Sequence, residues 1–171
     1  MTLYGRTAPI PRRTAWLAAP GRSYRYSGIR EIGTGIPQFM IPLLERVRAS
    51  VGVAFDSVLA THYRDGADRL GWHADDEAEL GPEPALAIVS LGAPRMLRFR
   101  RRRGRVAGTG SLGVTLTAGS LLYMAPGVQR DWEHCVPARA QAGRRISLGL
   151  RRLHTADVTE STAAEAGAGN A

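Results

Sequence analysis

Residues 145–151 read RISLGLR, and this heptapeptide alternates aliphatic side chains with charged or small ones. Because successive side chains of a β-strand point to opposite faces, the alternation predicts a strand. One face carries the aliphatic residues, which suit a hydrophobic core: Ile146, Leu148 and Leu150. The other face carries two arginines that flank a floor of small residues: Arg145, Ser147, Gly149 and Arg151.

The second face is too charged for a core and too regular for a turn. It fits a small dicarboxylate whose two ends accept charge-assisted hydrogen bonds from Arg145 and Arg151. A 2-oxo dicarboxylic acid would also chelate a metal through its keto acid end, while its far carboxylate binds an arginine. An edge strand with solvated arginines is the alternative interpretation.

Outward from this heptapeptide, further short segments alternate in the same way and are separated by Gly, Pro and Asp turns. The segments predicted as strands are residues 24–27, 53–63, 70–73, 85–91, 95–101, 113–117, 120–124 and 145–153. Residues 37–51 instead carry apolar side chains at helical spacing, with Pro42 in the first turn or at a bend. This pattern favours a mostly β sandwich or jelly roll over a parallel α/β sheet.

The length of 171 residues and the composition indicate one compact domain, predicted to cover residues 1–154. Residues 155–171 are rich in Ala, Gly, Thr and Glu without a hydrophobic period and are expected to be a disordered tail. The single Cys135 excludes an internal disulfide. With no signal-peptide pattern and no apolar run of the roughly 20 residues that span a membrane, we expect a cytoplasmic monomer without membrane contact.

The charge is strongly positive: all 23 basic residues are arginine, against 15 acidic ones, which gives a formal net charge of +8. Such an excess attracts phosphate polymers, although solubility alone is also an explanation. The arginines concentrate around Gly104, where we expect a cationic hairpin tip that faces phosphates: Arg98, Arg100, Arg101, Arg102, Arg103 and Arg105. A solvated charge run is the usual alternative.

A His-x-Asp pair lies within the sequence GWHADDE at residues 71–77. In an extended segment, His73 and Asp75 project to the same side and can share one ion. A downstream histidine on a neighbouring strand would complete a face of two histidines and one carboxylate, which leaves positions open on Fe(II). His134 is the best candidate, because His62 is opposite in strand phase and His154 borders the tail. The alternative interpretation is that His73 and His134 share no ion and are simply a surface and a core histidine.

Seven motifs occur together in one order: YRYSG at 24–28, YRDG at 63–66, GWHADDE at 71–77, SLGA at 90–93, GSLL at 119–122, WEH at 132–134 and RISLGLR at 145–151. Their succession, from about residue 4 to residue 153, resembles the AlkB family of Fe(II)- and 2-oxoglutarate-dependent dioxygenases. It most resembles the DNA-repair branch. The resemblance implies a double-stranded β-helix with one or two helices packed on the outside, and iron on His73, Asp75 and His134.

The resemblance also implies the reaction. With Fe(II), 2-oxoglutarate and O2, such an enzyme removes alkyl groups oxidatively from nucleobase ring nitrogens in DNA, and releases formaldehyde, succinate and CO2. The residues implied in cosubstrate binding are Thr61, Tyr63, Arg145, Ser147 and Arg151.

The chain departs from the repair branch at two of these positions, because Thr61 and Ser147 stand where that branch usually has Asn. Their hydroxyls are shorter than an amide, so we expect a weaker or slightly altered cosubstrate pocket. The family also has some tens of residues more before the segment that matches residues 3–6, so part of the substrate-facing lid is expected to be missing here.

The implied substrate, a base such as 1-methyladenine or 3-methylcytosine, is positively charged. We therefore expect the acidic pair Asp76 and Glu77, beside the iron, to favour it over a neutral base. Aromatic rings could clamp the flipped cationic base. The resemblance places Tyr24 and Tyr26 at the mouth of the site and Trp16 near a base-stacking position. For each ring, ordinary core packing is the alternative.

Two other functions stay open at this stage. The same oxygenase chemistry could act on RNA or on a protein side chain. The chain could also be a non-catalytic nucleic-acid-binding module that kept the scaffold, although such a module has no need of both the ion-binding face and the arginine pair.

Overall fold

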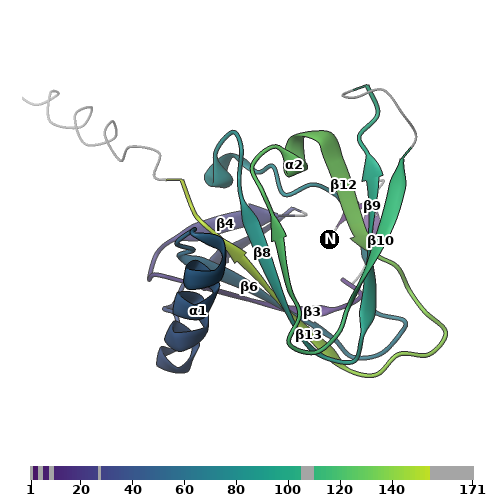
Figure 1. The fold of residues 1–171 in the computed structure, drawn as a ribbon, viewed down its shortest axis with the longest axis horizontal. Coiled ribbons are helices and arrows are strands. Elements are labelled where there is room, and N and C mark those ends of the chain that lie inside the picture. The colour runs from purple at the N-terminus through teal and green to yellow at the C-terminus, as the bar shows by residue number, and fades with distance from the viewer. Residues whose placement is uncertain (1, 4–5, 8–9, 27, 105–109, 155–171) are drawn as a thin grey trace, which may run out of the picture.

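Two antiparallel sheets face each other and form the body of the protein in the computed structural model, which describes residues 2–3, 6–7, 10–26, 28–104 and 110–154 (Figure 1). The larger sheet has the strand order β11-β8-β13-β6-β3, and the smaller has the order β10-β9-β12-β7. Strands β1 and β2, and strands β4 and β5, form two short additional pairs. The predicted mostly β, jelly-roll class is confirmed.

The strands are β1 Thr2–Leu3, β2 Arg6–Thr7, β3 Arg13–Ala18, β4 Ser23–Tyr26, β5 Ile29–Ile32, β6 Ser57–Tyr63, β7 Leu70–His73, β8 Leu86–Gly92, β9 Arg95–Arg101, β10 Ser111–Leu116, β11 Leu121–Met124, β12 Trp132–Val136 and β13 Arg145–Arg151. The helices are η1 Gln38–Met40, α1 Ile41–Val51, η2 Ala78–Leu80 and α2 Val128–Asp131. Within the described ranges, none of these helices is long and apolar enough to cross a membrane.

Helix α1 has the predicted position, and its sequence explains both of its ends. Pro42 lies in the first turn, where its missing N–H leaves no hydrogen bond unmade. The helix ends at Gly52, whose φ of 72° is in the left-handed region that favours glycine.

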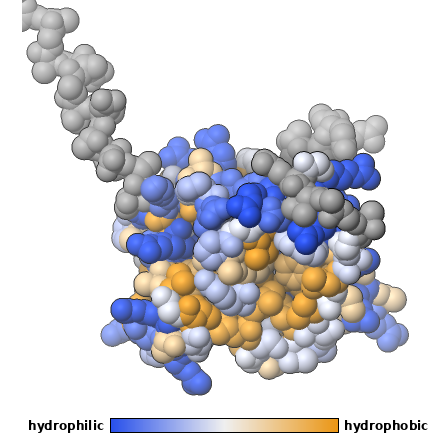
Figure 2. Space-filling model, turned by 45° about the horizontal axis from the view of Figure 1, so that its top comes forward, coloured by the Kyte–Doolittle hydropathy of each residue, from blue (hydrophilic) through white to orange (hydrophobic). Residues whose placement is uncertain are grey.

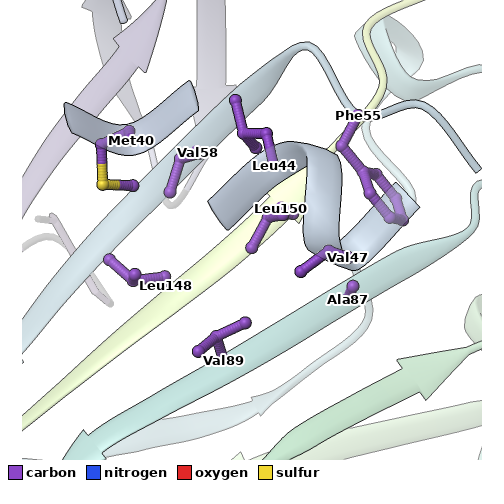
Figure 3. Close-up of a cluster of buried hydrophobic side chains, with 9 residues drawn as sticks. All are labelled: Met40, Leu44, Val47, Phe55, Val58, Ala87, Val89, Leu148 and Leu150. Atoms are coloured by element: carbon purple, nitrogen blue, oxygen red, sulfur yellow. The ribbon is translucent and has the colours of Figure 1, made fainter. Parts of the chain in front are cut away.

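This helix packs on the outer face of the larger sheet. Figure 3 shows Leu44 and Val47 of α1 over the aliphatic side chains of the strands below, which include Leu150 of β13 and Val58 of β6. Fully burying one aliphatic side chain contributes about 1.5–3 kcal/mol, so this cluster fixes α1 to the sheet. A second core fills the space between the two sheets: Tyr63, Leu86, Ile88, Leu97, Phe99, Leu116, Met124 and Val136.

Strand β13 lies in the centre of the larger sheet, between β8 and β6, and not at an edge. Its aliphatic face points outward to α1 and its arginine face points into the space between the sheets, as the alternation predicts. The prediction that Ile146 lies in the core is wrong, because its side chain is 42% exposed, whereas Leu148 and Leu150 are buried. Helix α1 covers only one end of the sheet, and Ile146 lies opposite the equally uncovered Leu91 at the other end.

Some elements differ from the prediction. Residues 53–56 are not part of β6, and β3 and β5 were not predicted. Apolar side chains also remain exposed outside the strands, with Phe39 at 79%. Figure 2 shows apolar residues across the centre of one face of the molecule and hydrophilic residues around its margin. The predicted tail, residues 155–171, lies outside the described residues.

Candidate metal centre and its cavity

Three predicted ligands meet at the inner face of the smaller sheet. Strands β7 and β12 pair antiparallel with His73 directly opposite His134, and Asp75 follows the end of β7. The Nε2 atom of each histidine lies 3.8 Å from an oxygen of Asp75, and the three ligand atoms lie within 4.8 Å of one another. Ligand atoms about 2 Å from one shared ion lie at most about 4 Å apart, so a small closure brings all three onto one metal.

The protonation of these groups suits a divalent cation. The Nδ1 of His73 is 2.9 Å from the carbonyl oxygen of Gly71, which directs its Nε2 toward the other two ligands. Burial, and then the charge of His73, lowers the pKa of His134 to about 4, so its imidazole is neutral near pH 7. Burial acts to raise the pKa of Asp75, but the charge of Arg151 and the two imidazoles hold that pKa well below its usual range. Metal ligands must be deprotonated in this way.

The Asp75 residue is held from two sides. The Nη2 of Arg151 donates to its Oδ1 at 3.1 Å, and its own backbone N–H donates to Oε1 of Gln129 at 3.0 Å. Gln129 lies on α2 and is only 1% exposed. No sequence signal pointed to Gln129, because a lone glutamine in a Pro-Gly turn segment carries no motif.

A cavity of about 160 Å³ lies beside the three ligands, between the two sheets. All five residues expected to bind cosubstrate line it: Thr61, Tyr63, Arg145, Ser147 and Arg151. The register of β6 and β13 explains this grouping, because Thr61 lies opposite Ser147 and Tyr63 opposite Arg145. Arg12, which the sequence analysis also missed, lines the same cavity.

Arg145 is the clearest sign of what the cavity binds. It is 2% exposed, its Nε donates to Oγ of Ser90 at 2.9 Å, and its guanidinium carbon lies 5.2 Å from the centre of the Tyr63 ring. Its Nη1 is buried and has no hydrogen-bond partner among the described residues. A buried guanidinium with an unused donor calls for an anion, and a carboxylate is its best-matched partner. The cavity thus fits a 2-oxo diacid between the metal ligands and Arg145.

The three aromatic candidates form a buried stack. The ring centres of Trp16 and Tyr24 are 4.6 Å apart, and those of Tyr24 and Tyr26 are 5.5 Å apart. Trp16 is 4% exposed and Tyr24 is fully buried, so both rings pack in the core in this structure, and the base-stacking position expected of Trp16 and the mouth position expected of Tyr24 are not seen. The unpredicted strand β3 carries Trp16 into the core, and Tyr24 donates a 2.8 Å hydrogen bond to Glu77. Only Tyr26 lines the cavity.

The acidic pair separates in the structure. Glu77 lines the cavity, where burial and the charge of Asp75 raise its pKa to about 7. Asp76 points away and forms a 2.6 Å ion pair with Arg102. Of the acidic pair expected to favour a cationic base, only Glu77 therefore lines the cavity, because the carboxylate of Asp76 is paired with an arginine of the neighbouring hairpin.

The arginine hairpin has the predicted strand phase: Leu97 and Phe99 are buried, whereas Arg98 and Arg100 are exposed. Residues 105–109, and with them Arg105, lie outside the described residues. Arg103 is exposed at the turn.

Three of the hairpin arginines have partners within the protein. Arg100 pairs with Glu133 at 2.7 Å and lies over the ring of Trp72. Arg101 lies over the ring of Trp132 at 4.3 Å. Arg102 turns inward, so the expectation that it faces phosphates does not hold for this residue.

Comparison with known proteins agrees with this geometry. The family model of the 2OG-Fe(II) oxygenase superfamily matches residues 3–152. DNA oxidative demethylase ALKBH2 of Mus musculus is 35% identical over 160 residues, which cover 88% of this chain and 65% of that protein. ALKBH2 of Arabidopsis thaliana is 33% identical, over 87% of this chain and 55% of that protein. Alpha-ketoglutarate-dependent dioxygenase alkB homolog 3 of Rattus norvegicus is 32% identical, over 86% of this chain and 52% of that protein. The chain thus spans less than two thirds of the length of these relatives.

Proposed function

The chain belongs to the 2OG-Fe(II) oxygenase superfamily and within it to the AlkB family, and from this premise we propose that it is a DNA oxidative demethylase. The similarity to proteins named DNA oxidative demethylase ALKBH2 supports the reaction class. The observation that carries the proposal is the placement, in one cavity, of three metal-ligating side chains and the unpartnered donor of Arg145.

In this proposal, His73, Asp75 and His134 hold Fe(II), which together with 2-oxoglutarate and O2 supplies the oxidant for an N-methyl group. Two histidines and one carboxylate leave open positions on the ion, as an oxygenase requires. Arg151 keeps Asp75 ionised and oriented, and Gln129 fixes the backbone of the same residue. The chain's own contribution is thus to hold the reactants in place.

Arg145 binds the far carboxylate of 2-oxoglutarate through the edge that carries its unpartnered Nη1. Thr61 and Ser147, facing each other across β6 and β13, offer hydroxyls toward the same ligand. The Nη2 of Arg151 donates to Asp75 and its Nη1 to the carbonyl of Gly149, so its buried Nε, which has no partner among the described residues, is the donor that it offers to the same ligand.

The substrate we propose is alkylated DNA. Glu77 is the acidic residue that faces the cavity besides the metal ligand, so it is the group that would favour a positively charged methylated base. The oxidised N-methyl group then leaves as formaldehyde. The exposed hairpin arginines, above all Arg98 and Arg103, are placed to contact the nucleic-acid backbone.

Formaldehyde release tests the proposal. The protein is incubated with Fe(II), ascorbate and 2-oxoglutarate, and with methylated single-stranded DNA, duplex DNA, RNA or a protein extract in parallel. We expect turnover on DNA, its loss in His73→Ala and its retention in His62→Ala, whose imidazole is outside the cavity lining. Turnover on RNA or protein alone would replace DNA as the substrate. Nucleic-acid binding without turnover would identify a binding module.

A further inference from the structure

Arg102 differs from the other hairpin arginines because its contacts run toward the metal ligands. Its Nη1 donates to Oδ2 of Asp76 at 2.6 Å and to the backbone carbonyl of Gln129 at 2.9 Å. Its backbone N–H donates to the carbonyl of Asp131 at 2.9 Å. One residue of the hairpin is therefore fastened both to the segment after the metal carboxylate and to α2.

Gln129 extends this connection to the metal ligand. Its Oε1 accepts the backbone N–H of Asp75, and its Nε2 donates to Sδ of Met124 at 3.4 Å. With 1% of its surface exposed, its amide has no freedom to move independently of α2. A displacement of α2 therefore displaces the group that holds Asp75.

We propose that Arg102 is a positioning residue for the metal centre, which acts on Asp75 through Gln129. It ties the hairpin, the α2 turn and the loop after β7 into one unit, and thereby sets where the Asp75 carboxylate meets the two histidines. The proposal rests on the metal site proposed above. It assigns to Arg102 a role different from the phosphate contact expected of a hairpin arginine.

Electrostatics alone predicts the opposite effect on metal binding. Removing the positive Arg102 side chain frees the negative Asp76 next to a divalent cation, which would strengthen metal binding by Coulomb's law. Removing a positioning contact weakens it, and loss of an outer hydrogen-bond partner typically lowers metal affinity about 10- to 100-fold. The sign of the change therefore distinguishes the two explanations.

The test is a titration of the apo protein with Co(II), followed by the visible absorption of the bound ion. The variants are Arg102→Ala, Gln129→Ala and the double variant, with Arg102→Lys as a milder change. Arg130→Ala is the matched control, because it removes an arginine of α2 whose side chain hydrogen-bonds Glu83 and Asp131 and, among the described residues, makes no hydrogen bond to Gln129 or Asp75. Thermal unfolding of each apo variant shows whether the fold is kept.

We expect Arg102→Ala and Gln129→Ala each to weaken Co(II) binding about 10-fold, with the double variant close to the weaker single variant. The Co(II) affinity of Arg102→Lys should lie between those of the wild type and Arg102→Ala, and the Co(II) affinity of Arg130→Ala should equal that of the wild type. Unchanged or tighter binding in Arg102→Ala would overturn the inference, as would effects that simply add. His73→Ala separates the premise from the inference: if it binds Co(II) like wild type, the metal site itself is wrong.

Discussion

The two sheets contribute to the site in different ways. The larger sheet supplies the cosubstrate wall from the paired strands β6 and β13, where Thr61, Tyr63 and Arg145 are buried and aligned by register. The smaller sheet supplies His73 from the end of β7 and His134 from the middle of β12, whereas Asp75 lies in the loop after β7, where hydrogen bonds from Arg151 and to Gln129 hold it. Strand pairing thus fixes the cosubstrate half and the two histidines, whereas the position of Asp75 depends on its hydrogen bonds with Arg151 and Gln129.

The largest effect we predict is on the metal half. Asp75→Ala removes a ligand and leaves Arg151 buried without its partner. We expect metal binding to disappear and, because half of a buried ion pair is left uncompensated, the free energy of unfolding to fall by about 3–5 kcal/mol. Co(II) titration and urea unfolding measure the two effects. Glu45→Ala, at an exposed position on α1, is the control. Retained metal binding in Asp75→Ala would refute the ligand assignment.

The next largest effect concerns cosubstrate binding alone, with metal binding unchanged. Arg145→Ala removes the proposed carboxylate partner, and truncating one side of a buried charge pair costs about 2–5 kcal/mol. We therefore expect the KM for 2-oxoglutarate to rise at least about 30-fold with unchanged Co(II) affinity. The neighbouring Arg144→Ala, at an exposed side chain, should change neither. A fall in metal affinity with a normal KM would show that the two halves are not separable.

A smaller change links the two halves. A Cβ added at Gly149 would lie 2.7 Å from Nη1 of Arg151, so the guanidinium, whose Nη2 donates to Asp75, must shift. We expect Gly149→Ala to weaken Co(II) binding several-fold, less than the roughly 10- to 100-fold loss that removal of such a partner causes. Gly110→Ala adds a Cβ that meets no atom of the described residues within 4 Å and serves as control. Equal metal affinity in the two variants would show that Arg151 does not orient Asp75.

The smallest effect concerns the loop that follows β6. Arg64 hydrogen-bonds Asp68 and lowers the pKa of Asp68 to about 2. A pKa lowered by folding stabilises the protein above the unfolded value near 4, and that stabilisation is lost as the pH falls through 2. Because Arg64 is half exposed, solvent screens the pair, and we expect the ionised Asp68 to contribute only about 1–2 kcal/mol to the free energy of unfolding. The difference in unfolding free energy between wild type and Asp68→Asn should shrink between pH 4 and pH 2. A constant difference would contradict the ion pair.

The sequence predicted best what depends on local periodicity. The alternation in residues 145–151 identified the arginine face, and the apolar spacing in residues 37–51 identified α1. The spacing of His73 and Asp75 is equally local, and strand phase selected His134 over His62. Each of these features needs only neighbours in sequence and the geometry of one strand or helix.

The sequence could not show contacts that depend on the packing of distant segments. Strand β3 pairs with the edge of β6, and this pairing places Trp16 in the core, where the sequence pattern alone did not put it. Gln129 and Arg102 acquire their roles only when α2 meets the hairpin, 26 residues or more away in sequence. The exposure of Ile146 could not be predicted either, because periodicity shows which face of a strand a side chain is on but not how much of that face a helix covers.

The central claim is that one cavity holds Fe(II) on His73, Asp75 and His134 and a keto diacid against Arg145. Anaerobic titration tests it directly, with Fe(II) and 2-oxoglutarate added separately and then together while visible absorption is recorded. The account predicts a charge-transfer band only when both are present, abolished in His73→Ala and requiring much more 2-oxoglutarate in Arg145→Ala. No band with both present, or an undiminished band in His73→Ala, would contradict it.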